Sequence, residues 1–150
     1  MSAEDNKELI RRLFDRFRSH DTSSLEELCH SDMLYETPEF DTLKGVDAYR
    51  QVFEEATRSI PDLEPTLEEI VAEGDKVFAI HRVRGTLKGD YAGIPPTNEP
   101  MELLVSDVIT IRDGKVAEHR EFYDVLTILR QLDAVDEGPP RSPGEAQAPR

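Results

Sequence analysis

The sequence of 150 residues has few features that would cross-link it or anchor it in a membrane. Its single cysteine, Cys29, cannot form an internal disulfide bond, and chains without disulfides are typical of the reducing cytoplasm. No apolar run approaches the ~18 residues that a membrane helix needs. The opening stretch MSAEDNKELI lacks the basic-then-apolar pattern of a signal peptide. We therefore expect a cytoplasmic protein that does not act in a membrane.

Positive charge is also scarce. The chain carries 32 acidic and 18 basic residues, for a net charge of −14. Such a charge disfavours nucleic acids and anionic membranes as partners. Of the basic residues, 13 are Arg and only 5 are Lys. This balance fits either a high-salt host, in which acidic surfaces keep proteins soluble, or simply an acidic surface.

Hydrophobic periodicity predicts helices first and strands later. Apolar residues at helical spacing predict helices near 9–17 and 46–59, and a closing helix at 125–132. Ser23 and Glu26 form a capping-box pattern for a short helix between the first two. Patterns with a period of two predict a brief strand at 33–37 and then strands at 67–73, 76–88, 101–112 and 115–123.

This order of elements predicts an α+β fold. We expect a curved antiparallel sheet with helices over its concave face, forming a cone around a cavity. The cone domain should span residues 1–133. Residues 134–150 contain the stretch DEGPPRSPGEAQAPR, which offers nothing large to bury, so we expect a disordered, acidic and Pro-rich tail.

Three carboxylates are the candidates for catalysis. Asp107 lies among apolar residues on one face of the strand 101–112, where an Asp is costly unless it is paired or protonated. Asp124 stands where the last strand becomes the last helix, so it could cap that helix or carry protons at the cavity. Glu36 stands in the short strand and could point inward to the site or outward to solvent.

Polar residues on neighbouring strands could bind a substrate. His81 alternates with apolar residues on one face of its strand, Arg82 lies on the other face, and His119 shares a face with Glu121 and Tyr123. An inward His is either a satisfied core residue or part of a site. No His/Cys/Asp set has metal-ligand spacing, and no phosphate loop or nucleotide fingerprint is present. We therefore expect neither a metal nor a cofactor.

The stretch YAGIPPTNEPMELL (residues 91–104) is a stiff, nearly uncharged loop that runs into a strand. Two prolines fix φ and Gly93 permits a turn. With Ile94 as an apolar contact, this loop could rim the cavity. It could also be a rigid connector or a dimer contact.

These residues carry a resemblance to a known family. The segments concerned are LEELCHSDMLYETP, IPDLEPTLEEIVAEGDKV, RGTLKGDYAGIPPTNEPMEL and IRDGKVAEHREFYDVLTILRQLD. Over residues 5–133 the chain resembles the SnoaL-like polyketide cyclases (ester cyclases) of the nuclear transport factor 2-like (cystatin-like) superfamily. The resemblance implies the same curved-sheet cone. It also implies an aspartate, matching Asp124, that acts as general acid/base in an intramolecular aldol cyclisation without a metal.

Two further resemblances concern single motifs. The stretch REFYD (120–124) is similar to the closing motif of limonene epoxide hydrolase, in which Arg82 and Asp124 would match two members of an Asp-Arg-Asp set. Asp107 resembles the protonated, hydrogen-bond-donating Asp of ketosteroid isomerase, although the base of that enzyme would fall on Thr37.

The sequence thus predicts acid/base chemistry on a small apolar carbonyl compound, by cyclisation, isomerisation or hydration. Asp124 would carry protons with Asp107 or Glu36 as second carboxylate, and Arg82 or His119 would polarise an oxygen. A non-catalytic module that binds a small molecule, or a dimerisation scaffold, are the alternatives. Leu104 and Val108 should face outward from the convex face of the sheet, which favours a homodimer through that face.

Overall fold

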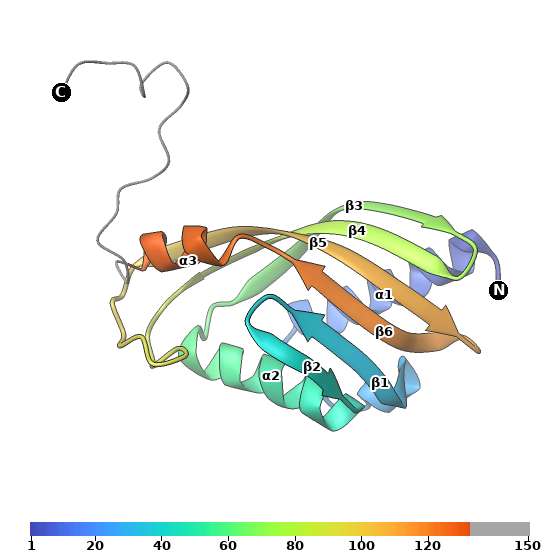
Figure 1. Cartoon of the computed structure of the whole chain (residues 1–150), viewed down its shortest axis with the longest axis horizontal. Helices are drawn as coiled ribbons and strands as arrows, with labels where there is room; N and C mark the ends of the chain where they lie inside the picture. Colours follow the sequence, from blue (N-terminus) through green and yellow to red (C-terminus); the bar gives the residue numbers. More distant parts are fainter. Residues whose placement is uncertain (133–150) are drawn as a thin grey trace, which may run out of the picture.

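The computed structural model describes residues 1–132, and the predicted tail at 134–150 lies outside the described residues. The helices are α1 (Ala3–Arg18), α2 (Val46–Ser59) and α3 (Val125–Gln131), and a 3₁₀ turn, η1, spans Leu25–Glu27. The strands are β1 (Cys29–Thr37), β2 (Phe40–Lys44), β3 (Glu64–Glu73), β4 (Lys76–Thr86), β5 (Pro100–Arg112) and β6 (Lys115–Phe122). The α+β class is confirmed, and Figure 1 shows α1 and α2 lying along one curved sheet.

One sheet contains all six described strands, in the order β2-β1-β6-β5-β4-β3. The strands from β3 to β6 form the predicted antiparallel meander. However, β1 runs parallel to β6, so the sheet is mixed and not wholly antiparallel. The chain leaves the β1–β2 hairpin through α2 and reaches β6 only after three more strands, a crossover long enough for parallel pairing. Because β2 and β3 remain as edges, the sheet is not closed into a barrel.

The segment between α1 and β1 differs from the prediction. Only the 3₁₀ turn η1 forms there, and Ser24 before it has a left-handed φ of 57°. The hydroxyl of Ser23 donates to Asp21 (2.5 Å), and the carboxylate of Glu26 accepts from Arg50. Since both side chains have other partners, they cannot form the capping box that would begin a helix.

The first strand is longer than predicted and has an unpredicted neighbour. β1 begins at Cys29, and Pro38 lies in a turn that leads directly into β2. β2 pairs back onto β1, with Leu34 opposite Lys44. No residue of β2 is buried, so its sequence lacks the alternation by which strands are recognised.

Two clusters of buried side chains form the core. The stripe predicted for α1 is confirmed, because Leu9, Ile10, Leu13, Phe14 and Phe17 are all buried. These side chains pack with α2 and with the inward face of the sheet in the first cluster. The second cluster lies where α3 covers the other end of the sheet, and includes Leu103 and Ile128. The odd-numbered positions of β5 from Met101 to Ile111 are buried, so β5 contributes to both clusters.

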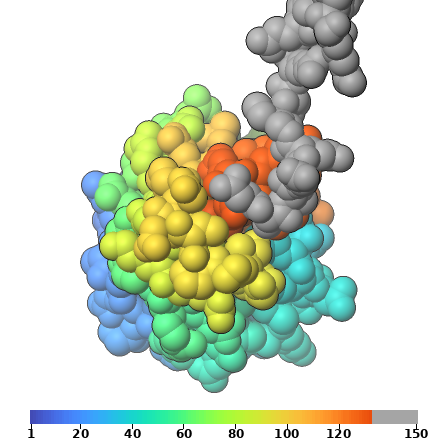
Figure 2. All heavy atoms as spheres, turned by 90° about the vertical axis from the view of Figure 1, so that its left-hand side faces the viewer, coloured from blue at the N-terminus to red at the C-terminus, as the bar shows by residue number. Residues whose placement is uncertain are grey.

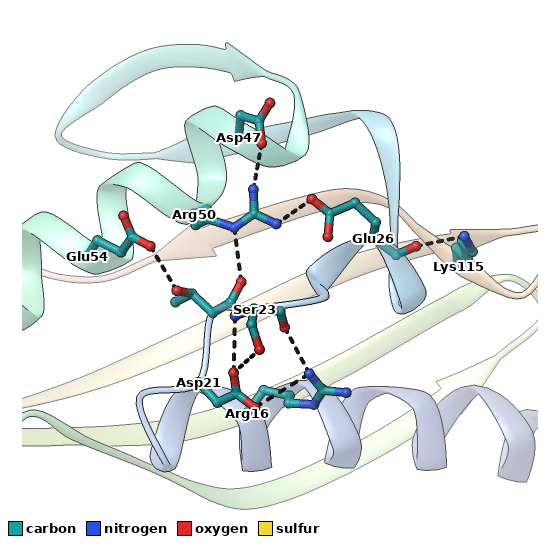
Figure 3. A network of polar contacts seen from close by, with 9 residues as sticks. Arg16, Asp21, Ser23, Glu26, Asp47, Arg50, Glu54 and Lys115 are labelled. Atoms are coloured by element: carbon teal, nitrogen blue, oxygen red, sulfur yellow. Dashed lines mark hydrogen bonds and ion pairs between the residues drawn. The ribbon is translucent and has the colours of Figure 1, made fainter.

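A polar network fastens the loop between α1 and β1 to the elements around it (Figure 3). Arg50 of α2 donates to the carbonyl of Thr22 (2.9 Å) and to the carboxylate of Glu26. Lys115 of β6 donates to the carbonyl of Glu26 (2.7 Å), and Arg16 of α1 to that of Ser23 (2.9 Å). One loop therefore links α1, α2 and β6, which all contribute to the cavity described below.

The face of the sheet away from α1 and α2 carries exposed apolar side chains. Val71, Phe78, Leu104 and Phe122 are between 44% and 62% exposed. Val71 lies opposite Phe78, which lies opposite Val108, so an apolar row crosses three strands. The outward orientation predicted for Leu104 is thus confirmed. Among the helices of residues 1–132, none is long and apolar enough to cross a membrane.

Candidate active site

A cavity of about 620 Å³ lies between the sheet and the helices α1 and α2. A small-molecule site typically has a volume of roughly 300–1,000 Å³ and a mainly apolar wall. The apolar side chains that line this cavity include Phe14, Phe17, Val52, Phe53, Leu103 and Val105. The cavity can therefore hold a compound with a largely apolar body.

Three neighbouring strands direct titratable side chains to the cavity side. In the sheet Asp107 of β5 lies between Ala79 of β4 and Glu121 of β6. His81 is two residues beyond Ala79, and His119 is two residues before Glu121. Because side chains two apart in a strand share a face, His81, Asp107, His119 and Glu121 all point inward. The alternation of apolar residues around them in the sequence fixes this orientation.

Asp107 accepts hydrogen bonds from both histidines. Its Oδ2 lies 2.6 Å from Nδ1 of His81, and its Oδ1 lies 2.7 Å from Nε2 of His119. The Asp107 side chain is completely enclosed, whereas the side chain of His81 is 6% exposed and lines the cavity. No hydrogen bond of the described residues reaches Nε2 of His81, so this nitrogen is free to meet a ligand.

Hydrogen bonds decide the charges of Asp107 and His119. Burial by itself would raise the pKa of the Asp107 carboxyl, but the bonds from His119 and His81 outweigh burial and lower it. Asp107 is therefore an ionised acceptor. It differs in this from the protonated, hydrogen-bond-donating Asp of ketosteroid isomerase, which it resembles in the sequence. Burial would likewise lower the pKa of His119, but the bond to Asp107 and the charges of Asp107 and Glu121 raise it.

Glu121 was not among the predicted site residues, and it lines the cavity beside this group. Its side chain is 17% exposed and its Oε1 lies 3.7 Å from Nε2 of His119. The hydroxyl of Tyr35 donates to its other oxygen (3.0 Å). Burial is the main cause that raises the pKa of the Glu121 carboxyl, and the negative charge of Asp107 adds to it. The sequence did contain a signal, because Glu121 shares a strand face with His119.

A second carboxylate, Glu39, lies in the turn between β1 and β2 and also lines the cavity. It accepts from the hydroxyl of Tyr91 (2.9 and 3.0 Å) and from that of Tyr123 (2.8 Å). Tyr91 belongs to the loop 87–99, which Figure 2 shows in yellow between α3 and α2. The three side chains thus join the loop, the β1–β2 turn and the end of β6 at one part of the cavity wall.

The loop that includes YAGIPPT takes part in this wall only at its beginning. Tyr91 and Ala92 line the cavity, whereas Ile94 does not and packs against the second core cluster. Pro95 and Pro96 are exposed. The contact predicted for Ile94 is therefore supplied by Tyr91, because the pairing of Tyr91 with Ile94 turns the chain back on itself.

Asp124 lies at the helix and not in the cavity wall. Its Oδ1 accepts from the backbone amides of Leu126 (3.0 Å) and Thr127 (3.3 Å), and its Oδ2 from the Thr127 hydroxyl (2.7 Å). It is therefore the N-cap of α3. Its exposed carboxylate is not among the residues that line the cavity, although its neighbour Tyr123 is.

Two other predicted residues have partners on the outer face of the sheet. The carboxylate of Glu36 lies 2.9 Å from Nε of Arg120. The guanidinium of Arg82 contacts Glu68 (2.6 Å) and Glu102 (2.9 Å). Neither Glu36 nor Arg82 lines the cavity. The structure therefore brings together His81, Asp107, His119 and Tyr123 from the predicted set, and leaves Glu36, Arg82, Ile94 and Asp124 outside the cavity wall.

One group of described side chains has the composition of a metal site. Ligand atoms of His81, Asp107 and Glu121 lie within 4.8 Å of one another. However, Nδ1 of His81 and Oδ2 of Asp107 are 2.6 Å apart and share a hydrogen bond. Two ligands about 2.1 Å from one ion stand roughly 3 Å apart, with no proton between them. In the described residues these side chains form a hydrogen-bond network, and an ion bound by Nδ1 of His81 would have to break the bond to Asp107.

Comparisons with known proteins agree with the family that the sequence resembles. The sequence profile of the SnoaL-like polyketide cyclases matches residues 7–132. The aklanonic acid methyl ester cyclase DnrD of Streptomyces peucetius is 29% identical over 132 residues, which cover 83% of this chain and 88% of DnrD. A crystal structure from Jannaschia sp. CCS1, described as a SnoaL-like polyketide cyclase, matches with a TM-score of 0.81 at 24% identity, over 89% of this chain and 94% of that chain.

An LEH-like epoxide hydrolase of M. tuberculosis matches with a TM-score of 0.70 at 14% identity, over 88% of this chain and 92% of that chain. At such identities the two solved structures show the fold alone. That fold is the nuclear transport factor 2-like α+β cone, as the sequence predicts. Within this class the profile match over most of the chain decides the family. The chain belongs to the SnoaL-like polyketide cyclases.

Proposed function

We propose that the protein catalyses ring closure of a small, largely apolar carbonyl compound of the polyketide type, by an intramolecular aldol addition. The main support is the 2.6 Å bond from His81 to Asp107, which leaves Nε2 of His81 free at the cavity wall. A neutral imidazole held in this way is a general base. The name of the related DnrD, a cyclase of a methyl ester, supports the choice of reaction.

The reaction begins with His81. Its Nε2 removes a proton from a carbon next to a carbonyl group, and Asp107 stabilises the imidazolium that results. The enolate carbon attacks a second carbonyl carbon of the same molecule, so one C–C bond forms and the π bond of that carbonyl breaks. The oxygen takes the proton of protonated Glu121. The proton on His81 then returns to Glu121 through solvent, and the product is an isomer of the substrate.

The two carboxylates suit these roles because their environments differ. The pKa of Glu121 is raised mainly by burial, so it can hold a proton to donate. The pKa of Asp107 is lowered by its two histidine partners against the effect of burial, so it stays ionised behind the base. Separated pKa values let one site provide an acid and a base near neutral pH.

The test is turnover with aklanonic acid methyl ester and with a panel of smaller 1,5-diketo esters, followed by chromatography and mass spectrometry. We expect an isomeric product, and a decrease of about 10²- to 10⁴-fold in kcat for His81→Gln and for Glu121→Gln, the range for losing a general acid or base. Glu36→Gln, on the outer face, is the control. Wild-type rates in both cavity variants would reject this mechanism.

Ligand binding without catalysis is the second candidate. It is favoured by the enclosure of Asp107, whose two oxygens already have partners and cannot contact a ligand. In that case a compound should copurify unchanged and bind equally well to His81→Gln. Conversion of any member of the panel by the wild type, lost in His81→Gln, would reject this alternative.

A further inference from the structure

The proposed mechanism uses His81 as the base but gives no role to the other nitrogen of His119. Nδ1 of His119 lies 2.7 Å from the hydroxyl of Tyr49 on α2. Both side chains are enclosed, with Tyr49 3% and His119 2% exposed. The hydroxyl of Tyr49 is one end of a chain of hydrogen bonds. The chain runs from Tyr49 through His119 and Asp107 to His81.

We propose that Tyr49 is a positioning residue that holds His119 as the second donor to Asp107 whether His119 is neutral or charged. This inference rests on the proposed function only for its effect on turnover. A neutral imidazole has one N–H, and here Nε2 must carry it to reach Asp107. Nδ1 is then an acceptor, and the phenol donates to it.

The same phenol fits the charged form of His119. When Nδ1 also carries a proton, it donates, and the oxygen of Tyr49 accepts. Burial keeps the pKa of the Tyr49 hydroxyl well above its usual value, so the phenol stays protonated and can change direction by rotation. A methyl or a ring edge in its place would leave a buried nitrogen without a partner in either state, which is costly.

Charged and titratable groups from every adjacent strand face His119. Asp107 comes from β5, Glu121 from β6 and Tyr35 from β1, and His81 of β4 lies across Asp107. Asp107 and Glu121 favour the charged form of His119, and Tyr49 is the only partner of Nδ1 among the described residues. Because an unpaired charged donor costs more than an unpaired neutral acceptor, losing the phenol should disfavour the charged form most.

The experiment follows the ring nitrogens of ¹⁵N-labelled histidines by NMR between pH 5 and 9. The chain has 4 histidines, and single His→Gln variants assign them. In the wild type we expect neutral His119 to carry its proton on Nε2. In Tyr49→Phe the titration midpoint of His119 should move down by roughly half to one pH unit. The kcat/KM of Tyr49→Phe should also fall, because Asp107 then has a less firmly held second donor.

Tyr35→Phe is the matched variant. Tyr35 is also a buried tyrosine, with its ring 4.8 Å from that of Tyr49, but it donates to Glu121 and not to His119. It should leave the tautomer of His119 unchanged. A proton on Nδ1 in the neutral wild type, or a His119 titration that is the same in Tyr49→Phe, would overturn the inference. The tautomer of His119 in the wild type tests the inference even if Tyr49→Phe fails to fold.

Failure of this inference and failure of the proposed function are distinguishable. If Tyr49→Phe shifts the titration of His119 but no substrate is turned over, the positioning role stands without the cyclase. If turnover depends on His81 while the titration of His119 does not respond to Tyr49, the cyclase stands without the positioning role.

Discussion

The buried titratable groups predict that the protein loses stability as the pH rises from about 5 to about 8. The pKa of Glu121 is raised in the fold, mainly by burial. The pKa of His119 is raised too, because the bond to Asp107 and nearby negative charge outweigh burial. The folded state therefore binds more protons than the unfolded state, and by linkage the free energy of unfolding decreases with pH.

The pH window follows from the usual values of the two groups, which are 4.5 for Glu121 and 6.5 for His119. The stabilisation of the fold by protonated Glu121 begins to decline above pH 4.5 and levels off above the folded pKa of Glu121. The stabilisation by protonated His119 is fully present below pH 6.5 and is lost as the pH rises through the folded pKa of His119. The depressed pKa of Asp107 acts in the opposite sense, but only in acid below its usual value of 3.8.

The size of the effect follows from the linkage relation. Each pH unit between the folded and unfolded pKa of one group changes the free energy of unfolding by about 1.4 kcal/mol. In a chain of this length that corresponds to roughly 3–6 °C in Tm. We expect the decline to be visible in thermal scans at constant ionic strength between pH 5 and 8.5.

Two variants locate the source of the decline. Glu121→Gln and His119→Gln should each flatten part of the slope, Glu121→Gln mainly at the acidic end. His30→Gln is the control, because the ring of His30 bonds to the carbonyl of Arg112 (2.5 Å) and does not line the cavity. A Tm that stays level or rises over this range, or a slope that neither cavity variant alters, would refute the reasoning.

Four further predictions concern other parts of the chain. Tyr91→Phe removes a hydrogen bond from the loop to Glu39, so amide exchange in residues 90–96 should accelerate. Tyr123→Phe loses a bond to the same carboxylate but should leave this exchange unchanged. Equal exchange in both variants would contradict the idea that Tyr91 holds the loop in place. Gly85→Ala would place a Cβ 2.2 Å from Cγ2 of Ile60 and should cost about 1–3 kcal/mol in urea unfolding, unless Ile60 can move aside and the midpoint stays the same. Asp124→Asn should reduce turnover less than Asp107→Asn, because an Asn can still cap α3, and an equal loss would favour Asp124 as the proton carrier. The apolar row on the outer face is flanked by charges of both signs, at Arg82, Glu102, Arg120 and Glu36, and such a surface suits a second copy of this chain. Light scattering should therefore give a dimer at micromolar concentration, and Phe78→Glu should dissociate it. A monomeric wild type would contradict this.

The sequence predicted those parts of the fold whose side chains alternate between core and solvent. The stripe of α1 and the odd positions of β5 are examples, since burial on one side repeats with the period of the element. It missed β2, in which no residue is fully buried, and it predicted a helix at Ser23, where the hydroxyl binds Asp21 instead. The parallel pairing of β1 with β6 joins residues about 85 positions apart, and no local pattern reports such a contact.

The site was predictable where burial itself is unusual. An Asp and two His on apolar strand faces must find partners, and in the fold they find one another. The partners from outside the meander were not predictable in this way. Tyr49 comes from α2 and Glu39 from a turn, and each reaches the cavity only because the helix and the turn pack at a particular position over the sheet.

The choice between Glu121 and Asp124 shows how far strand geometry alone can decide. His119, Glu121 and Tyr123 are odd-numbered, and all three line the cavity, whereas Phe122 is 45% exposed on the other side. Had β6 continued, Asp124 would have pointed outward with Phe122, because side chains alternate along a strand. The strand instead ends, and the carboxylate of Asp124 turns to the first amides of α3. On β6, a carboxylate that exchanges a proton with a ligand in this cavity therefore has to stand at an odd position, and Glu121 is the one that does.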